Sequence, residues 1–243
     1  MVIKPDLSGQ VAVVTGGGRG IGRAIALALA QCKASVFITA RTLSEIETVA
    51  GEIKKANGKA FFSQCDIAEE GQINQMFDKV MDNFGRLDIM INNAAIGRYG
   101  PFQNFTTSDL DDLIAVNMRG TFICCREALQ RMVPQRSGYI INISSVVGFK
   151  GYENQSAYTA TKHAVVGMTK TLALEAQKYN IRASVIHPGG VDTDLAGEAR
   201  PDLDRSILMQ PEDIAQTVLF LLSLSDRAAV DEIYIRRRGS SPF

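Results

Sequence analysis

The feature that most constrains the fold of this chain is a regular alternation of short apolar runs with longer segments of helical periodicity. Most of the short runs are rich in β-branched residues and almost continuously apolar, which is typical of parallel strands covered on both faces. The expected strands are Val11–Thr15, Ser35–Thr39, Lys59–Gln64, Leu87–Asn92, Gly138–Ser144, Ile181–His187 and Val230–Ile235. The expected helices are Gly20–Cys32, Thr42–Gly58, Glu69–Phe84, Ser108–Met132, Ser156–Lys178 and Pro211–Leu222. This alternation predicts βαβ units and a doubly wound α/β fold with a seven-stranded, mostly parallel sheet and helices on both faces.

The length of 243 residues allows one large domain or two small ones. Glycine and proline residues lie at expected turns and do not cluster into a linker, so we predict a single domain over residues 1–243. The longest irregular stretch, at about residues 189–210, is expected to form a functional loop or lid, because such loops are uncommon inside compact domains. At the start of the second expected helix, Thr42 and Glu45 have the spacing of a capping box.

Charge and hydropathy exclude several classes of protein. The 26 basic and 26 acidic residues give a formal net charge of zero, without the basic excess expected of a protein that binds nucleic acid or anionic membranes. The chain is 46% hydrophobic and 21% charged, as in ordinary folded proteins, and no apolar run is long enough to span a bilayer. The first residues do not resemble a signal peptide, so we expect a cytoplasmic protein with reduced cysteines.

A glycine-rich turn lies directly between the first expected strand and the first expected helix. It reads Thr15-Gly16-Gly17-Gly18-Arg19-Gly20-Ile21-Gly22, a G-x-x-x-G-x-G spacing. Backbone without Cβ atoms can approach a pyrophosphate closely, and the free N–H groups of a helix start attract its charge. A connector without a ligand is the alternative, but the position at the first strand–helix turn favours dinucleotide binding in a Rossmann-type fold. The candidate cofactor-binding residues here are Gly16, Arg19, Gly20, Ile21 and Gly22.

The end of the second expected strand bears on which dinucleotide is bound. A site that prefers NAD places a carboxylate there to hold the ribose 2′-hydroxyl. This strand is followed instead by Arg41, whose guanidinium is a bidentate donor for a 2′-phosphate, and Arg19 can add a second cation. The alternative is that Arg41 is a solvated residue before a helix. We predict a preference for NADP(H) over NAD(H).

Two further strand ends carry weaker signals of the same site. Asp66 and Ile67 follow the third strand, where a carboxylate can meet an adenine amino group. Asn93 and Ala94 follow the fourth, at the crevice where open α/β sheets bind ligands.

A candidate reacting group is centred on the fifth expected helix. Tyr158 and Lys162 are four residues apart and share one helix face, where an ammonium lowers the pKa of a phenol and makes it a general acid or base. A surface pair is the alternative. Ser145 ends the fifth strand, where its hydroxyl can bind a developing oxyanion. Asn117 is a poor helix former inside the fourth expected helix, and it could hold a water beside Lys162.

In order and spacing these motifs resemble those of the classical short-chain dehydrogenase/reductase family, including members similar to 3-oxoacyl-[acyl-carrier-protein] reductases. The resemblance covers essentially the whole chain. It implies that Tyr158 protonates a carbonyl, Ser145 orients it, and Lys162 lowers the tyrosine pKa while binding the nicotinamide ribose. It implies that Asn117 positions a relay water. It also implies contacts with the nicotinamide carboxamide from three residues of one turn, Pro188, Gly189 and Thr193.

The chain departs from the family pattern at two places. Ala95 stands where the family has glycine, which requires the local backbone to accept a side chain. The C-terminal segment, residues 231–238, lacks the Asp-Gly-Gly ending frequent among 3-oxoacyl-[acyl-carrier-protein] reductases. The second departure weakens a fatty-acid assignment and favours other small carbonyls.

Substrate and partner predictions are less specific. The candidate substrate-binding residues are Ser145, Val147, Tyr152 and Leu195, which would form a mostly apolar pocket for a small carbonyl or alcohol. An acyl carrier protein could dock on Arg131, Arg136 and Lys178, although solvated helix ends are the favoured interpretation. The two histidines, His163 and His187, lack partners at metal-binding spacing, so no metal is assigned. The fourth and fifth expected helices resemble the family's dimer faces and carry more apolar surface than one sheet face needs, which implies a homotetramer or homodimer. The apolar residues concerned are Ile123, Cys124, Ala128, Val165, Val166, Leu172 and Leu174.

Two hypotheses follow for the function. The first is an NADP(H)-dependent oxidoreductase that interconverts a ketone or aldehyde and an alcohol, with 3-oxoacyl thioesters among the possible substrates. The second is a catalytically silent NAD(P)-binding sensor or scaffold. A sensor needs the glycine turn but not the tetrad of Asn117, Ser145, Tyr158 and Lys162, so the tetrad favours the enzyme.

Overall fold

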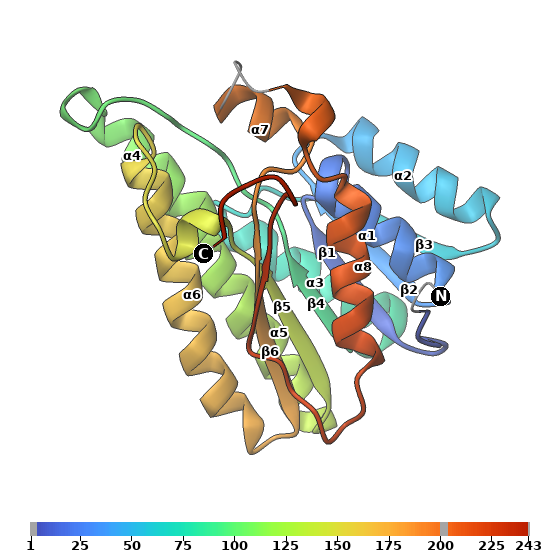
Figure 1. The fold of residues 1–243 in the computed structure, drawn as a ribbon. Coiled ribbons are helices and arrows are strands. Elements are labelled where there is room, and N and C mark those ends of the chain that lie inside the picture. The colour runs from blue at the N-terminus through green and yellow to red at the C-terminus, as the bar shows by residue number, and fades with distance from the viewer. Residues whose placement is uncertain (1–3, 200–203, 243) are drawn as a thin grey trace.

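The structure is a computed structural model that describes residues 4–199 and 204–242. Seven strands form one sheet in the order β3-β2-β1-β4-β5-β6-β7 (Figure 1). The strands are β1 (Val11–Thr15), β2 (Ser35–Ala40), β3 (Lys59–Gln64), β4 (Ile89–Asn92), β5 (Gly138–Ile143), β6 (Ile181–Pro188) and β7 (Glu232–Ile235). Every strand pairing in the described chain is parallel. The predicted α/β fold is confirmed, and its sheet is parallel throughout the described residues.

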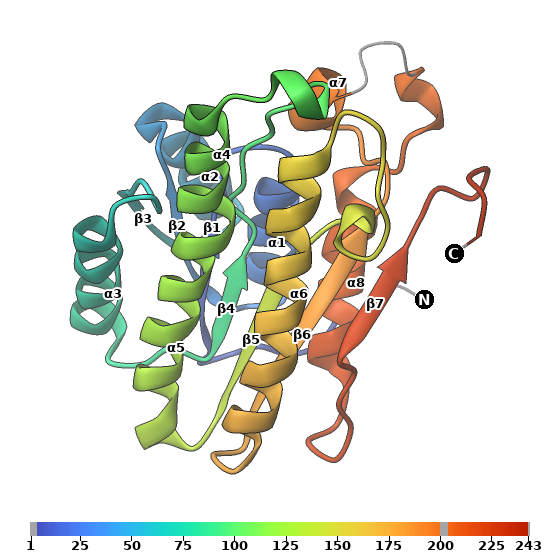
Figure 2. The same cartoon turned by 90° about the vertical axis from the view of Figure 1, so that its left-hand side faces the viewer.

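Helices cover both faces of the sheet, as the alternation predicts. The α-helices are α1 (Gly20–Gln31), α2 (Leu43–Lys55), α3 (Glu70–Phe84), α4 (Thr107–Leu113), α5 (Thr121–Gln135), α6 (Ser156–Gln177), α7 (Asp194–Ala199) and α8 (Pro211–Ser223). Helices α1, α2 and α8 lie on one face, and α3, α5 and α6 lie on the other (Figure 2). A separate apolar cluster fills the space on each side of the sheet.

The apolar pattern of the strands explains why the sheet is buried on both faces. All five residues of β1 are buried, and their side chains alternate between the two clusters, with Val14 in one and Val13 in the other. On α1, Ile25 and Leu29 are fully buried and pack into the first cluster, which seats the helix that follows the glycine turn. The start of α1 is therefore held in a fixed place above the end of β1.

The order of the strands creates one crevice at the edge where the strands end. The chain runs outward from β1 to β2 and β3, then returns to place β4 against the other side of β1. The connections after β1 and β4 therefore leave in opposite directions, and ligands of open α/β sheets bind at such a switch point. The glycine turn and the Asn93–Ala94 segment both lie there.

The fourth expected helix is not continuous, which corrects the prediction of one helix over Ser108–Met132. Helices α4 and α5 are joined by a π-helical turn, Ile114–Gly120. Asn117 lies in this turn, and its side chain bonds the backbone of Ile96. A Cβ atom on Gly120 would lie 2.3 Å from the carbonyl oxygen of Ile67, so this residue can sit against that segment only as glycine. Such tertiary contacts stabilise a π-turn that sequence periodicity cannot reveal.

The predicted capping box at Thr42 and Glu45 is absent, because the Thr42 side chain makes no capping hydrogen bond. Glu45 instead packs over Gly18 of the glycine turn, where a Cβ atom on Gly18 would be 2.7 Å from the Cβ of Glu45. A capping box does form at the start of α8, between Gln210 and Asp213.

The predicted lid at about residues 189–210 contains α7 and a short 3-10 turn, Arg205–Ile207. Residues 200–203 of this segment lie outside the described residues. The four cysteines are buried and unpaired. No helix within the described ranges is long and apolar enough to cross a membrane.

Candidate active site

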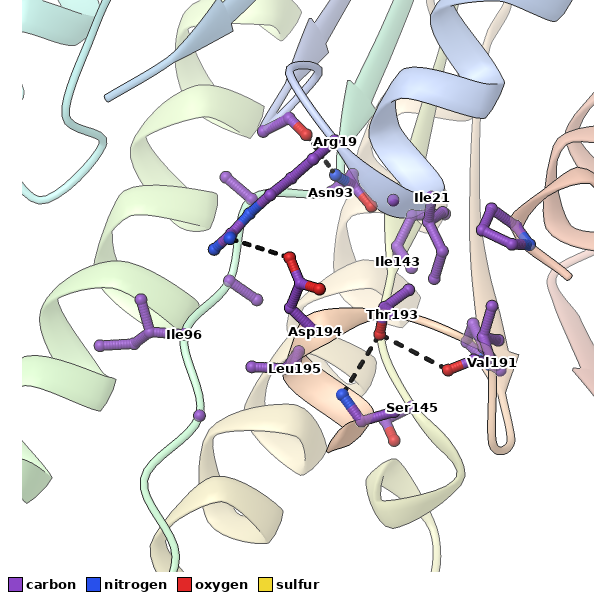
Figure 3. Close-up of a pocket in the computed structure, with 18 of the residues that line it drawn as sticks. Arg19, Ile21, Asn93, Ile96, Ile143, Ser145, Val191, Thr193, Asp194 and Leu195 are labelled. Atoms are coloured by element: carbon purple, nitrogen blue, oxygen red, sulfur yellow. Dashed lines mark hydrogen bonds and ion pairs between the residues drawn. The ribbon is translucent and has the colours of Figure 1, made fainter. Parts of the chain in front are cut away.

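A cleft of about 750 Å³ opens above the ends of the strands, between the glycine turn on one side and the first turns of α6 on the other (Figure 3). Of the side chains and glycines predicted for the site, all line this cleft except Gly22 and Asn117. The structure thus brings together residues from six separate loops of the sequence.

The glycine turn is shaped by contacts that leave no room for side chains. Gly16 and Gly20 have φ values of 63° and 52°, a left-handed backbone that glycine adopts without strain. A Cβ atom on Gly22 would lie 2.1 Å from the carbonyl oxygen of Gly16. Gly22 therefore does not line the cleft but lets α1 begin directly against the turn. This cradle of exposed backbone at a helix start fits a pyrophosphate.

Asn93 fixes the glycine turn to the end of β4. Its side-chain amide donates to the carbonyl oxygens of Thr15 at 3.0 Å and Gly16 at 3.1 Å. In return, the Thr15 hydroxyl accepts from the backbone N–H groups of Asn93 and Ala94, each at 3.1 Å. Ala95 is not among the residues with a positive φ, so its side chain replaces the glycine of the family pattern without backbone strain.

The far end of the cleft carries Arg41, Asp66 and Ile67, which follow β2 and β3. The carbonyl oxygen of Arg41 accepts a hydrogen bond from Gln64 at 2.7 Å, which fixes its backbone. Its guanidinium makes no hydrogen bond or ion pair with the described residues, and it is exposed. One carboxylate oxygen of Asp66 accepts from the backbone of Ala68 at 2.9 Å. This end therefore presents one unpaired cation and one anchored carboxylate.

Arg19 is already engaged across the cleft. Its guanidinium lies 3.0 Å from the carboxylate of Asp194, in the first turn of α7 (Figure 3). Both side chains are more than half exposed, so the pair is screened by water. Arg19, the second cation predicted to bind a 2′-phosphate, is thus paired with a carboxylate of the predicted lid in this structure.

Tyr158 and Lys162 lie in the wall formed by α6, and both are buried, at 7% and 3% exposure. The Lys162 ammonium lies 5.7 Å from the centre of the Tyr158 ring and donates to the carbonyl oxygen of Ile143 at 3.1 Å. Burial lowers the pKa of Lys162 to about 8. It raises the pKa of Tyr158, and nearby Tyr99 adds to this increase, while a hydrogen bond with Ser145 opposes it.

The direction of the Tyr158 shift differs from the sequence prediction, which expected the lysine to lower the pKa of this phenol. Desolvation is the larger effect because both groups are enclosed by protein, and the ammonium does not contact the hydroxyl directly. In this state Tyr158 therefore carries its proton at neutral pH.

The two neighbouring serines after β5 face different surroundings. The Ser144 hydroxyl is buried and donates to the carbonyl oxygen of Lys162 at 3.1 Å. Ser145 is partly exposed to the cleft, and its side chain accepts from the backbone of Val147 at 3.3 Å. Ser145 is thus the serine whose hydroxyl is available beside Tyr158.

Asn117 supports the site from behind. Its side-chain amide is committed to the backbone of Ile96 at 2.9 and 3.0 Å and to the hydroxyl of Thr161 at 3.3 Å. The backbone carbonyl oxygen of Asn117, inside the π-helical turn, accepts from the Thr121 hydroxyl at 2.9 Å.

The turn after β6 forms the remaining rim. The backbone of Gly189 donates to Ile235 at 2.8 Å, which ties this turn to β7. The Thr193 hydroxyl accepts from Ala196 at 3.2 Å, and its methyl group would lie 3.2 Å from a Cβ atom on Gly20. The turn carrying Pro188 therefore approaches the glycine turn closely. Among the substrate candidates, Val147 is buried, Leu195 is half-buried and Tyr152 is 44% exposed.

A sequence profile described as short chain dehydrogenase matches residues 10–204. The chain belongs to this family. It is 37% identical over 218 residues to carbonyl reductase family member 4 of Xenopus laevis, covering 88% of this chain and 91% of that protein. It is also 37% identical over 226 residues to the 3-oxoacyl-[acyl-carrier-protein] reductase FabG of Aquifex aeolicus, covering 89% and 91%. A metagenomic short-chain oxidoreductase solved in complex with NADP shares 33% identity at a TM-score of 0.85, covering 97% of this chain and all of that one.

This short chain dehydrogenase is therefore an oxidoreductase that acts on carbonyl or CH–OH groups with a nicotinamide cofactor. Within the described part of the chain, no cluster of three or more His, Cys, Asp or Glu side chains is placed to hold a metal ion.

The sequence motifs of this dehydrogenase do not predict every residue that lines the cleft. Tyr99 packs edge-on against Tyr158, with ring centres 5.7 Å apart, and Glu45 lines the cleft beside Gly18. Neither belongs to a motif. Tyr99 lies in an irregular loop, and the sequence pattern predicts Glu45 only as part of a helix cap. Both positions depend on contacts between segments far apart in the sequence.

The surface predictions need correction. Five of the apolar residues expected at a subunit interface belong to the buried core: Ile123, Cys124, Ala128, Val165 and Val166. They are covered within one subunit, because the periodicity marks an apolar face without saying what covers it. Leu174 is 75% exposed, and Phe122 on α5 is 55% exposed. Arg131, considered for carrier-protein docking, bonds Glu127 at 2.6 Å and is mostly buried.

Proposed function

We propose that this dehydrogenase uses NADPH to reduce a ketone or aldehyde to an alcohol, or catalyses the reverse reaction, with Tyr158 as the acid or base. The observation that carries this proposal is the cluster of Tyr158, Ser145 and Lys162 on one wall of a cleft whose opposite wall is a glycine cradle. When bound in that cradle, the nicotinamide cofactor supplies or accepts the hydride.

Each member of the cluster has a role that its surroundings support. Tyr158 holds its proton at neutral pH because burial raises its pKa, which suits donation to a carbonyl oxygen. The Ser145 hydroxyl lies beside it and orients that oxygen. The Lys162 ammonium lies close enough to favour the phenolate that remains, and it bonds the nicotinamide ribose. Asn117, in the π-helical turn behind the cluster, is assigned the role of positioning a relay water.

The preference for NADP(H) is part of the proposal. It is supported by the unpaired, exposed guanidinium of Arg41 after β2 and by Arg19 in the glycine turn. Asp66, Ile67 and the turn from Pro188 to Thr193 are assigned to the adenine and carboxamide ends of the cofactor.

The substrate we propose is a small carbonyl compound or a 3-oxoacyl thioester, held by Val147, Tyr152 and Leu195. The relatives include both a carbonyl reductase and a 3-oxoacyl-[acyl-carrier-protein] reductase. We expect a cytoplasmic homodimer or homotetramer in which the lid covers the substrate. Docking of an acyl carrier protein is not favoured, because Arg131 is engaged by Glu127.

The proposal is tested by following NADPH oxidation with 3-oxoacyl thioesters, diketones, quinones and sugars. Tyr158→Phe is expected to lower turnover by about 10²–10⁴-fold while NADPH binding is kept. A variant with wild-type turnover would refute the role of Tyr158. A wild-type protein that binds NADPH tightly but reduces none of these compounds would favour the sensor instead.

A further inference from the structure

His187 is a buried side chain that the proposed chemistry does not use. It lies near the end of β6, directly before Pro188, and its side chain has 0% exposure. The imidazole is stacked on the Tyr234 ring, with 4.4 Å between ring centres, and it forms a T-shaped pair with the Phe149 ring, with 5.7 Å between ring centres. The ring is therefore held in one plane, and the directions of its two nitrogens are fixed.

Each nitrogen of His187 faces a hydrogen-bond acceptor. Nδ1 lies 3.2 Å from the carbonyl oxygen of Ser145, in hydrogen-bond geometry. Nε2 lies 3.3 Å from a carboxylate oxygen of Glu232, but without the alignment of a hydrogen bond. A neutral imidazole has one N–H and can satisfy only one acceptor, whereas the imidazolium can satisfy both. The geometry favours a neutral ring with its proton on Nδ1.

The charged groups around the ring are all accounted for among the described residues. Glu232 is held by the Lys170 ammonium at 2.7 Å and by the Tyr234 hydroxyl at 2.6 Å. Burial raises the pKa of Glu232, but these two partners outweigh it and leave the pKa below its usual value. Burial lowers the pKa of His187, and this outweighs the opposite effects of Ser145 and Glu232. The ring is thus neutral at pH 7, beside a carboxylate.

The carbonyl that faces Nδ1 belongs to the turn that carries the Ser145 hydroxyl. The same oxygen accepts from the backbone of Gly148 at 2.8 Å, which closes the 3-10 turn Val146–Gly148. A Cβ atom on Gly148 would lie 2.5 Å from the Ser144 hydroxyl and 3.3 Å from Nδ1 of His187. The turn is therefore in close contact with the ring, and Nδ1 faces the serine backbone.

We propose that His187 is a positioning residue for Ser145, acting through an Nδ1–H hydrogen bond to the Ser145 carbonyl that aims the serine hydroxyl at the substrate. This inference rests on the proposed function, in which Ser145 orients the carbonyl oxygen. Glu232 lies on the other side of the ring and is paired there with Lys170, on the helix that carries Tyr158.

A matched pair of variants separates this role from simple packing. The amide of His187→Asn can replace the Nδ1 donor, whereas that of His187→Gln reaches the place of Nε2 and faces Glu232. Both lose the stacked ring equally. We expect His187→Asn to keep kcat within about twofold of wild type and His187→Gln to lower it about three- to tenfold, as for one lost hydrogen bond. The Kd for NADPH should be unchanged in both. Equal kcat values in the two variants would overturn the proposal.

A second measurement does not depend on activity. Because the protein has only two histidines, ¹⁵N spectra of the His163→Gln variant report on His187 alone. At pH 7 we expect the neutral ring with its proton on Nδ1, and a proton on Nε2 would overturn the inference even if the variants fail to fold. If carbonyl reduction is absent from the wild type while the Nδ1–H form is observed, the proposed function fails and the His187 contact stands. The role assigned to that contact in catalysis then falls with the function.

Discussion

The cleft has two walls that are built differently. The first wall is formed by the ends of β1, β2 and β4, and the second is formed by β5, β6 and α6. The first is shaped by backbone, with two glycines at positive φ and an Asn93 amide that bonds two carbonyl groups of the turn. The second is shaped by buried ionisable side chains, Tyr158 and Lys162, whose pKa values burial moves in opposite directions. The first wall should therefore be sensitive to added volume, and the second to charge and pH.

The largest effect is expected from removing the buried charge of the second wall. Lys162→Met should lower turnover by at least about 10²-fold, because the remaining phenolate loses its cation. The same change should stabilise the cofactor-free protein at pH 7. Burial lowers the pKa of Lys162 from 10.5 to about 8, which corresponds to a penalty of up to about 3 kcal/mol for the charged form.

The sign of its pH dependence follows from proton binding. The unfolded chain holds the lysine proton up to about pH 10.5 and the folded protein only to about pH 8, so the penalty is complete below pH 8 and disappears above 10.5. The gain in unfolding free energy of Lys162→Met should shrink across that window. A gain that is constant from pH 7 to 11, measured by urea unfolding, would contradict the assignment.

The first wall is tested by adding one methyl group. Gly22→Ala would place a Cβ atom 2.1 Å from the Gly16 carbonyl, so we expect a loss of about 1–3 kcal/mol in unfolding free energy and weaker NADPH binding. Gly51→Ala is the matched control, since Gly51 lies inside α2 with nothing within 4 Å of its Cβ position. That control should gain up to about 1 kcal/mol from helix propensity. If Gly22→Ala and Gly51→Ala changed the unfolding free energy similarly, the close contact expected between the new Cβ atom and the Gly16 carbonyl would not persist in the variant, and the prediction would be wrong.

A smaller effect should reach only the outer end of the first wall. Arg41→Ser removes the unpaired cation and should weaken NADPH binding about tenfold while leaving NADH binding unchanged, as for one charge-assisted hydrogen bond. Titration with both nucleotides measures the ratio. Glu45→Gln is the companion variant, because the Glu45 carboxylate lines the same region as Arg41 and should oppose the binding of a 2′-phosphate. An equal loss for both nucleotides would refute the NADP(H) preference.

The smallest effect on cofactor binding and turnover is expected from substitutions on the exposed surfaces of α5 and α6. Phe122→Gln on α5 and Leu174→Gln on α6 replace exposed apolar side chains and should reduce the solution mass of the assembly. Cofactor affinity should not change in the subunits that remain folded. Light scattering that gives a monomer for the wild type would refute the predicted oligomer.

Much of the first wall was predictable from sequence because its signals are local. The position of the glycine turn between a buried strand and a helix requires only neighbouring residues, and a mostly parallel sheet follows from repeated βαβ units, whereas the order of its strands was decided by tertiary structure. The expected strands and most helices differ from the structure only by a few residues at their ends. The exception is the π-helical turn at Asn117, which depends on contacts with Ile96 and Thr161 across the fold.

The second wall was predictable in its membership but not in its electrostatics. The spacing of Tyr158 and Lys162 on one helix face is a property of the sequence, and so is the order of the motifs around them. The direction of the tyrosine pKa, the separate surroundings of Ser144 and Ser145, and the contact of His187 with the serine turn were decided by tertiary structure. The physical reason is that desolvation and directed hydrogen bonds depend on how closely distant segments pack, whereas periodicity and spacing are written along a single segment.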